Sequence, residues 1–300
     1  MFDNTDNLVF VGYICAGLAA LLFGSVSTVA KPVLSSIDPL LISSLVYLIS
    51  ALVFAPSTII NYRKSVIDKK NYLLIFASAG FGGILAPVFY FSGLNLTTAT
   101  DTSVLINGEI LFTVLIAILF FKEKVNKIGY LAILLVIIGV SIITTNLSFS
   151  KEILSLDLGN LLVLCSTLFW AMDNNVSKLI ASRVPIDRIV FTKSIIGGTI
   201  LLVIIILSGI SINVKYEQIP NILFLGILGF GGSLFFFLQS LKIIGTVRTI
   251  LIFSLTSVFG MIFASAFLHE SIGNHQIFAT VIILSGIYLI NSKYSHKKRD

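Results

Sequence analysis

Charged side chains are scarce in this chain. They make up 11% of its 300 residues, whereas 56% of the residues are hydrophobic and the mean hydropathy is +1.03. Because roughly a quarter of the residues of a soluble domain are charged, this composition excludes a soluble globular protein and indicates an integral membrane protein. The net charge of +6 comes from basic residues dispersed over short segments between apolar stretches. Such dispersal lacks the clustered basic face of a nucleic-acid-binding protein, so we expect no nucleic-acid partner.

Residues that carry most enzyme chemistry are also few. The three histidines, His269, His275 and His296, lie at the ends of apolar stretches or in the C-terminal tail. Cys15 and Cys165 lie in separate apolar stretches without a CxxC motif, so we expect two buried free thiols rather than a metal site or a disulfide. A GxxxxGK[ST] phosphate loop is also lacking. We therefore expect no enzyme activity, cofactor or metal site, and keep a membrane-embedded enzyme or a channel only as alternatives of another class.

Long hydrophobic runs, by contrast, fill the sequence. About 20 apolar residues cross a bilayer as a helix, and windows of that length predict an all-α protein with ten spans. The first span follows Asp3 and Asp6 without a basic segment and is too long for a signal-peptide core, so we expect it to be retained. The predicted spans are residues 8–30, 39–60, 72–93, 102–121, 128–146, 159–181, 189–209, 219–241, 247–268 and 274–292.

The distribution of lysine and arginine predicts the topology. With the N-terminus inside, sixteen of the 20 basic residues fall in cytoplasmic segments, and only Lys31, Lys151 and Lys215 fall outside. The positive-inside rule therefore places both termini in the cytoplasm and suits a prokaryotic inner membrane. The remaining basic residue, Lys193, lies about one turn inside the seventh span. We expect its ammonium to extend toward the cytoplasmic interface, with a buried functional charge as the alternative.

An internal repeat divides the chain into residues 1–148 and 149–300. A shift of 147 residues aligns eight identities in order, and a shift of 149 matches Gly80-Phe-Gly-Gly83 with Gly229-Phe-Gly-Gly232. Because each copy holds five spans, the second copy must enter the membrane in the opposite sense, as in the inverted repeats of secondary transporters. The aligned residues are Lys31 with Lys178, Leu94 with Leu241, Thr102 with Thr249, Phe112 with Phe259, Ala117 with Ala264, Phe120 with Phe267, Glu123 with Glu270 and Gly139 with Gly286.

Several of these segments resemble a known family. The run from Phe112 to Glu123, its echo from Phe259 to Glu270, the two glycines Gly139 and Gly286, and the segment 241–249 are similar to the EamA branch of the drug/metabolite transporter superfamily. The resemblance covers the whole chain and implies a secondary transporter that exports amino acids or similar small metabolites. A proton-coupled metabolite importer and a drug exporter are alternatives. It also implies a central cavity lined by spans one, three, four, six, eight and nine.

Glu109 is the first candidate site residue. It stands in an apolar span, where a carboxylate costs at least a few kcal/mol unless it has a partner or water. Helical spacing places Thr102, Ile106 and Thr113 on the same face, and the resemblance implies a place beside the central cavity. The repeat puts Thr256 at the mirrored position, so the two halves do not share this charge. Three roles stay open: proton coupling, because burial favours the neutral acid; a counter-charge for a substrate ammonium; or a structural carboxylate.

The sixth span carries the densest polar cluster. Trp170, Asp173 and Asn174 share a stripe with Ser166 and Ser177. Asp173 lies about one turn to the cytoplasmic side of the midpoint and Glu109 about one turn to the external side, so we expect both at one cavity with Trp170 as a wall. The alternative pairs Asp173 with Lys178 or another basic group.

Four further positions complete the candidate site. Ser25 and Thr28 lie in the first span at the place that mirrors the sixth span, and no acid accompanies them. That absence disfavours the cation/proton antiport of the small multidrug branch, which depends on a glutamate in its first helix. Tyr90 and Gln239 lie toward opposite ends of the third and eighth spans, where they line two vestibules or sit at the interface.

The third and eighth spans are rich in glycine. Residues 80–83 and 226–232 hold most of these glycines, and Pro87 follows the first group. Small residues allow close helix packing, and glycine also weakens a helix enough to bend it between two states. We favour packing and keep bending as the alternative.

Overall fold

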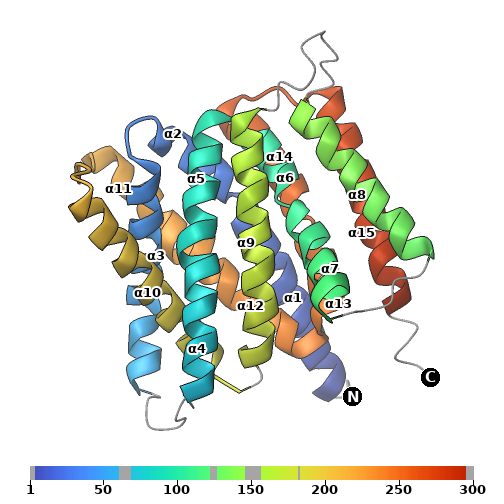
Figure 1. The fold of residues 1–300 in the computed structure, drawn as a ribbon, viewed down its shortest axis with the longest axis horizontal. Coiled ribbons are helices and arrows are strands. Elements are labelled where there is room, and N and C mark those ends of the chain that lie inside the picture. Colours follow the sequence, from blue (N-terminus) through green and yellow to red (C-terminus); the bar gives the residue numbers. More distant parts are fainter. Residues whose placement is uncertain (1–3, 61–68, 122–126, 146–156, 182, 295–300) are drawn as a thin grey trace.

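The computed structural model describes residues 4–60, 69–121, 127–145, 157–181 and 183–294, and every regular element in these ranges is a helix (Figure 1). Glu123, expected at a helix end, lies outside the described residues, as does His296. The first repeat holds α1 (Asn4–Gly24), α2 (Val26–Leu34), α3 (Pro39–Ile60), α4 (Lys69–Ser78), η2 (Ala79–Leu85), α5 (Ala86–Leu96), α6 (Ala99–Leu105), α7 (Gly108–Phe121) and α8 (Lys127–Thr145). The second holds α9 (Leu158–Ala181), α10 (Ile186–Leu207), η3 (Tyr216–Gln218), α11 (Ile219–Phe224), η4 (Leu225–Gly232), α12 (Ser233–Ile244), α13 (Thr246–Phe253), α14 (Thr256–Leu268) and α15 (Asn274–Tyr294).

Six helical stretches in the described part are long and apolar enough to cross a bilayer. They are Leu8–Leu34, Pro39–Ile60, Asn71–Leu96, Ile186–Leu207, Tyr216–Ile244 and Arg248–Leu268. The other four expected spans also coincide with helices, namely α6 with α7, α8, α9 and α15. The helical fold is confirmed, and the count of ten spans stays a prediction.

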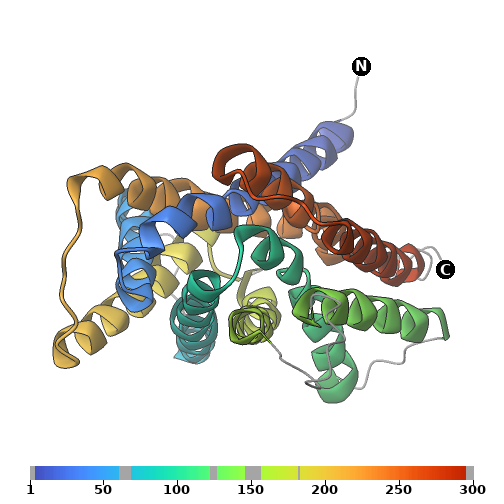
Figure 2. The same ribbon diagram turned by 90° about the horizontal axis from the view of Figure 1, so that it is seen from above.

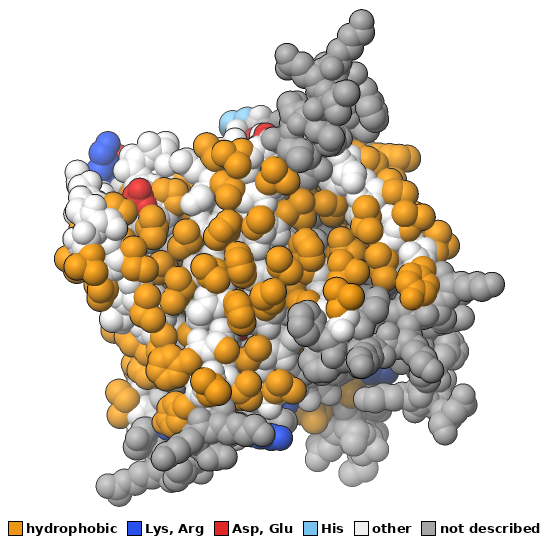
Figure 3. Space-filling view, in the orientation of Figure 1, with side chains coloured by type: hydrophobic (Ala, Val, Ile, Leu, Met, Phe, Trp, Pro, Cys, Tyr) orange, Lys and Arg blue, Asp and Glu red, His pale blue; other side chains and the backbone are white. Residues whose placement is uncertain are grey.

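The surface carries a broad apolar belt. In Figure 3, hydrophobic side chains cover the middle of the visible face and charged side chains lie near its two ends. Leu207 and Phe267 are exposed by 81% and 72%. Exposed apolar area of this extent marks a face that meets a nonpolar partner, and a belt around helices of this length fits a lipid bilayer. Cys15 is buried as expected, but the expectation for Cys165 is wrong: this thiol is exposed, because its side chain leaves α9 opposite the buried stripe.

The helices group into two mirrored bundles and two flanking pairs. One bundle, called bundle A, packs α1, α2, α11, η4, α12, α13 and α14 together; the other, bundle B, packs α4, η2, α5, α6, α7 and α9. The repeat exchanges these two groups, since spans one, eight and nine mirror spans six, three and four. The flanking pairs are α3 with α10 and α8 with α15, and the last pair lies side by side in Figures 1 and 2.

The two bundles pack together chiefly at one end, although Phe23 of α1 also contacts Trp170 of α9 near mid-depth. Both chain termini lie at the lower end of Figure 1, which we call the terminal end, and the opposite end is called the far end. At the far end, α2 packs against α5 and α6, and α14 packs against α6. The mirrored contacts at the terminal end would join α9 to α12 and α13, and α7 to α13. None of these three pairs packs together among the described residues.

Five spans are interrupted near mid-depth. The first breaks at Ser25, the fourth at residues 106–107 and the ninth at residues 254–255. The third and eighth contain the π-helical segments η2 and η4, which consist largely of the two glycine-rich runs. When the repeat shift is applied, the breaks of the fourth and ninth spans and the π-helical segments of the third and eighth spans coincide within about one residue, whereas the break at Ser25 has no counterpart in the continuous α9. π-helical turns of this kind often mark functional sites, and bending at these glycines stays a prediction.

Candidate functional site

A cavity of about 60 Å³ lies between the two bundles at the level of the breaks. Two acidic side chains and one basic side chain line it: Glu109, Asp173 and Lys193. Its apolar wall is aromatic and consists of Phe23, Trp170, Phe230, Phe237 and Phe253. A cavity of this volume accommodates only a few water-sized groups. Binding of a small metabolite would therefore require the two bundles to lie further apart than in this structure.

Asp173 and Lys193 form a buried ion pair. Their side chains are exposed by 2% and 3%, and they come from α9 and α10. The expectation that Lys193 reaches the cytoplasmic interface is wrong, because an opposite charge within the protein attracts an ammonium strongly where water is excluded. The alternative for Asp173, pairing with a basic group, is confirmed with Lys193 as that group. Ser78 and Ser177 also donate hydrogen bonds to Asp173 Oδ1, the second at 3.1 Å.

Glycines let three helices converge on this pair. A Cβ atom on Gly82 would overlap the Asp173 carboxylate, and one on Gly197 would lie 2.5 Å from the carbonyl oxygen of Gly83. The π-helical η2 therefore comes into direct contact with both α9 and α10. The packing role expected for these glycines is confirmed at Gly82 and Gly83. Tyr47 adds a link, because its hydroxyl donates to the carbonyl of Gly82.

Glu109 begins the second half of a broken helix. It lies in the first turn of α7, directly after the interruption at residues 106–107. An N-terminal turn of a helix favours an anion through its unpaired N–H groups and its dipole. Asn174 Nδ2 donates a hydrogen bond to Glu109 Oε1. This partner is a neutral amide, so the lining carries two carboxyl groups against the single ammonium of Lys193, and no basic group forms an ion pair with Glu109 among the described residues.

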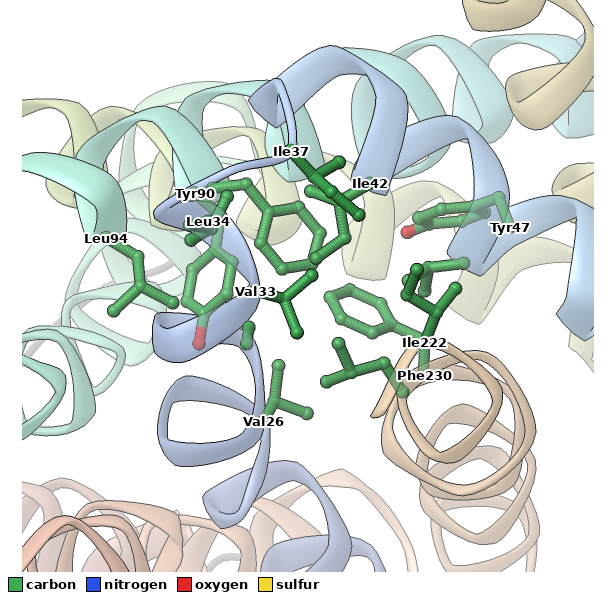
Figure 4. Close-up of a cluster of buried hydrophobic side chains, with 14 of the residues drawn as sticks. Val26, Val33, Leu34, Ile37, Ile42, Tyr47, Tyr90, Leu94, Ile222 and Phe230 are labelled. Atoms are coloured by element: carbon green, nitrogen blue, oxygen red, sulfur yellow. The ribbon is translucent and has the colours of Figure 1, made fainter. Parts of the chain in front are cut away.

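Trp170 lies against the aromatic wall as expected. Its ring is 5.4 Å from Phe23 and 5.3 Å from Tyr90, measured between ring centroids. Tyr90 itself does not line the cavity. It is fully buried in an apolar cluster between the cavity and the far end, together with Val33 and Phe230 (Figure 4). This cluster fills the space through which the cavity would otherwise reach the far end.

Three broken helices cross beside the cavity. Asn107 Nδ2, at the break of the fourth span, donates to Ser257 Oγ in the first turn of α14 at 2.9 Å. Ser27 in α2 and Ser103 in α6 share a hydrogen bond of 2.8 Å. A Cβ atom on Gly260 would overlap Ser103, so α6 and α14 approach each other as closely as their side chains allow.

The structure leaves three other expected residues outside the cavity lining. Ser25 Oγ donates to the carbonyl of Leu22 at 2.7 Å, which is a local bond at the break of the first span. Thr28 and Thr256 are buried, and their hydroxyl oxygens have no hydrogen-bond partner in the described part of the chain. A hydroxyl of this kind is uncommon in a folded protein and calls for an explanation.

Gln239 lines a second cavity, of about 530 Å³, toward the terminal end. Asp187 from α10 and Lys242 from α12 also line it, and a stacked pair of rings, Phe54 and Phe235, forms part of its wall with centroids 5.5 Å apart. Gln239 thus lines a cavity, and its expected place at a vestibule stays a prediction.

Sequence reasoning missed most of the aromatic wall. The chain has 24 phenylalanines, and no spacing distinguishes Phe23, Phe230 and Phe253 from those that face lipid. The sequence did mark Lys193, because it lies inside the predicted span 189–209 and outside the segments that connect the spans. Its depth of a single turn suggested the interface, whereas the rotation of α10 directs it inward.

Comparisons with known proteins agree with this fold. The EamA-like transporter family matches residues 10–145 and again residues 157–292. An uncharacterized transporter of Methanothermobacter thermautotrophicus is 30% identical over 293 residues, covering 93% of this chain and 85% of its own. The uncharacterized transporter YoaV of Bacillus subtilis is 26% identical, covering 93% and 96%. A solved crystal structure superposes with a TM-score of 0.68 at 16% identity, covering 95% of this chain and 96% of its own, which shows a shared fold.

Proposed function

Because the chain belongs to the EamA-like transporter family, we propose that it is a secondary transporter that exports amino acids or similar small metabolites by alternating access. In this proposal the ten helical spans cross the inner membrane of the cell and both termini are cytoplasmic. The surplus of lysine and arginine on that side supports this orientation. The far end is then external, and the terminal end faces the cytoplasm.

The observation that carries the proposal is the one-sided contact between the mirrored bundles. Bundle A packs against bundle B chiefly at the far end, whereas the mirrored helix pairs at the terminal end pack weakly or not at all among the described residues. An inverted repeat allows the two sets of contacts to exchange, because each set is built from equivalent segments. The arrangement seen here is then the state that faces the cytoplasm, and rocking of the bundles gives the state that faces outward.

We place the substrate between Glu109, Asn174, Asp173 and Trp170. The unmatched negative charge of the lining favours a bound cation, which is either a substrate ammonium or a proton on Glu109. The aromatic wall suits an apolar body or an ammonium held against a ring face. Lys193 is available to a substrate carboxylate if it exchanges partners from Asp173. These groups together fit a small zwitterion, such as an amino acid.

The remaining candidate residues line the path on either side of the cavity in this proposal. Thr28, Tyr90 and Thr256 each bury a hydroxyl that lacks a hydrogen-bond partner of normal geometry among the described residues. Water that enters when the far end opens would satisfy all three. Ser25 marks the hinge of the first span, and Gln239 lines the cytoplasmic vestibule with Asp187 and Lys242.

The function is tested by counterflow in proteoliposomes with a panel of labelled amino acids, amines and drugs. A carrier gives saturable uptake that unlabelled solute on the opposite side accelerates. A channel would give neither saturation nor acceleration, and an enzyme would yield a chemically altered solute. Absence of transport for the whole panel would contradict the proposed substrate class.

A second reading, a proton-coupled importer or a drug exporter, is favoured by the position of Glu109 beside a neutral amide and aromatic rings. An imposed pH gradient separates these outcomes. Uptake driven by an inward proton gradient identifies an importer, and uptake driven by an outward gradient identifies an exporter. Transport of hydrophobic amines without amino-acid transport identifies a drug carrier.

A further inference from the structure

The junction between α5 and α6 at the far end is held by two opposite charges. Lys31 Nζ donates to the carbonyl oxygens of Leu94 at 2.7 Å, Asn95 at 3.2 Å and Thr97 at 2.5 Å. These carbonyls lie at the C-terminal end of α5, where a helix leaves acceptors unpaired. Three bonds use all the donors of an ammonium.

Glu270 holds the other side of the same junction. Its Oε1 accepts from the backbone N–H of Ala99 at 3.0 Å, and its Oε2 accepts from the N–H and hydroxyl of Thr100 at 2.9 and 2.6 Å. These groups start α6. The C-terminus of a helix carries a partial negative charge and the N-terminus a partial positive charge. A cation at the first and an anion at the second are therefore each favourable.

The two charges come from the opposite bundle. Lys31 belongs to α2, and Glu270 follows α14, so both are carried by bundle A, whereas α5 and α6 belong to bundle B. The chain leaves α14 through His269 in the left-handed region, with φ of 55°, a conformation that is uncommon for residues other than glycine. Together these contacts join the bundles at the end where they are closed.

The mirrored junction at the terminal end lies between α12 and α13, at Gly245. The repeat shift gives Lys178 and Glu123 as the counterparts of Lys31 and Glu270, and the side chains of these two counterparts lie outside the described part of the structure. The contacts of Lys31 and Glu270 themselves join the two bundles at the closed end.

We propose that Lys31 and Glu270 form an external latch, which holds the far end closed and must be released before the cavity opens outward. The latch rests on the proposed alternating access, and it deepens that function by naming the residues that set the balance between its two states. Release exposes the ends of α5 and α6 to water, together with the buried cluster around Tyr90 and the buried hydroxyl of Thr28.

The test reads the access state directly, without transport. A single reporter, Thr28→Cys, is placed in a background with Cys15→Ala and Cys165→Ala. It is labelled in reconstituted vesicles by a membrane-impermeant maleimide added to the far-end side. We expect Lys31→Gln and Glu270→Gln to accelerate labelling on the order of tenfold, which is the factor by which they shift the equilibrium toward the outward state. A second reporter, Gln239→Cys, should react more slowly from the terminal side by a related factor.

Matched controls remove the same charges outside the latch. Lys215 and Glu217 are exposed at the far end, so Lys215→Gln and Glu217→Gln should leave both labelling rates unchanged. Lys31→Arg keeps the cation and its donors and should restore slow labelling, which excludes a folding defect. Rates for Lys31→Gln and Glu270→Gln equal to those of the controls would overturn the latch, as would faster labelling of both reporters.

The outcomes also separate the latch from the function on which it rests. If wild-type protein transports a solute but the two variants do not change labelling, the latch fails and the transporter stands. If no solute is transported while labelling shifts as expected, the latch stands as a conformational device and the transport proposal fails. Labelling of Thr28→Cys from the terminal side would refute the assignment of the closed end.

Discussion

Asp173 and Lys193 pair across α9 and α10 with almost no access to solvent. A buried pair of this kind contributes little net stability relative to apolar residues, but breaking it leaves an uncompensated charge. The pair therefore behaves as a unit, and its two residues should tolerate replacement by neutral residues only when both are replaced.

We expect Asp173→Asn and Lys193→Met each to destabilise the protein by about 3 kcal/mol. The double variant should recover most of that loss, because neither charge then stays unpaired. Unfolding in mixed detergent micelles measures the four stabilities of the cycle. If the losses of the single variants simply add in the double variant, the coupling energy between Asp173 and Lys193 is zero and the pair is not a unit.

Glu109→Gln removes the acidic group at this position and keeps an amide oxygen that can accept a hydrogen bond from Asn174. We expect the free energy of unfolding to stay within about 1 kcal/mol of wild type. The transport rate should fall about tenfold, since a loss of about 1.4 kcal/mol in binding costs a factor of ten. Counterflow rates with and without a pH gradient measure both effects. Glu217→Gln, on the exposed surface, is the matched control.

The response to pH decides the role of Glu109. A coupling group predicts that Glu109→Gln loses the dependence of transport on the pH gradient. A counter-charge predicts weaker binding of cationic solutes with the pH response retained. Unchanged rate and unchanged pH response together would leave Glu109 as a structural carboxylate.

The glycine contact at the ion pair gives a prediction with a built-in control. A Cβ on Gly82 would overlap Asp173, whereas one on Gly80, two residues earlier in the same π-helical segment, meets no atom within 4 Å. We expect Gly82→Ala to destabilise by about 2 kcal/mol through overpacking. Gly80→Ala should be neutral or slightly stabilising, because alanine lowers the entropy of the unfolded chain. Thermal unfolding compares the two, and equal effects would show that the contact at Gly82 is relaxed.

Much of the frame follows from the sequence. Apolar runs of membrane length predict helices at ten places, and the repeat predicts that the halves mirror each other. It also brings Glu109 and Asp173 to one cavity, because residues near mid-depth on polar stripes turn away from lipid. The hydrophobic pattern does not predict how each helix is rotated about its axis relative to its neighbour. Lys193 illustrates this, since its depth suggested the interface and the rotation of α10 buries it.

The same limit explains the residues that lie off the cavity. Tyr90 and Thr28 are polar and lie in the expected spans, but the bundles are closed around them in this state. If the proposed alternating access holds, the sequence has to serve two access states, whereas the structure shows one arrangement. The aromatic wall was hidden for another reason: phenylalanine is equally suited to lipid and to a cavity, so its presence alone does not discriminate.

The crossing of α6 and α14 supplies the last prediction. Gly260 lies against Ser103 so closely that a methyl group at this position would overlap it, whereas a methyl on Gly17 of α1 meets no atom within 4 Å. Gly260→Ala should push α14 away from α6 and weaken the contact that closes the far end, with a cost of about 1 to 3 kcal/mol in stability. Labelling of Thr28→Cys should accelerate in Gly260→Ala and stay unchanged in Gly17→Ala. If Gly260→Ala loses stability without a change in labelling, this crossing supports the fold and does not set the access state.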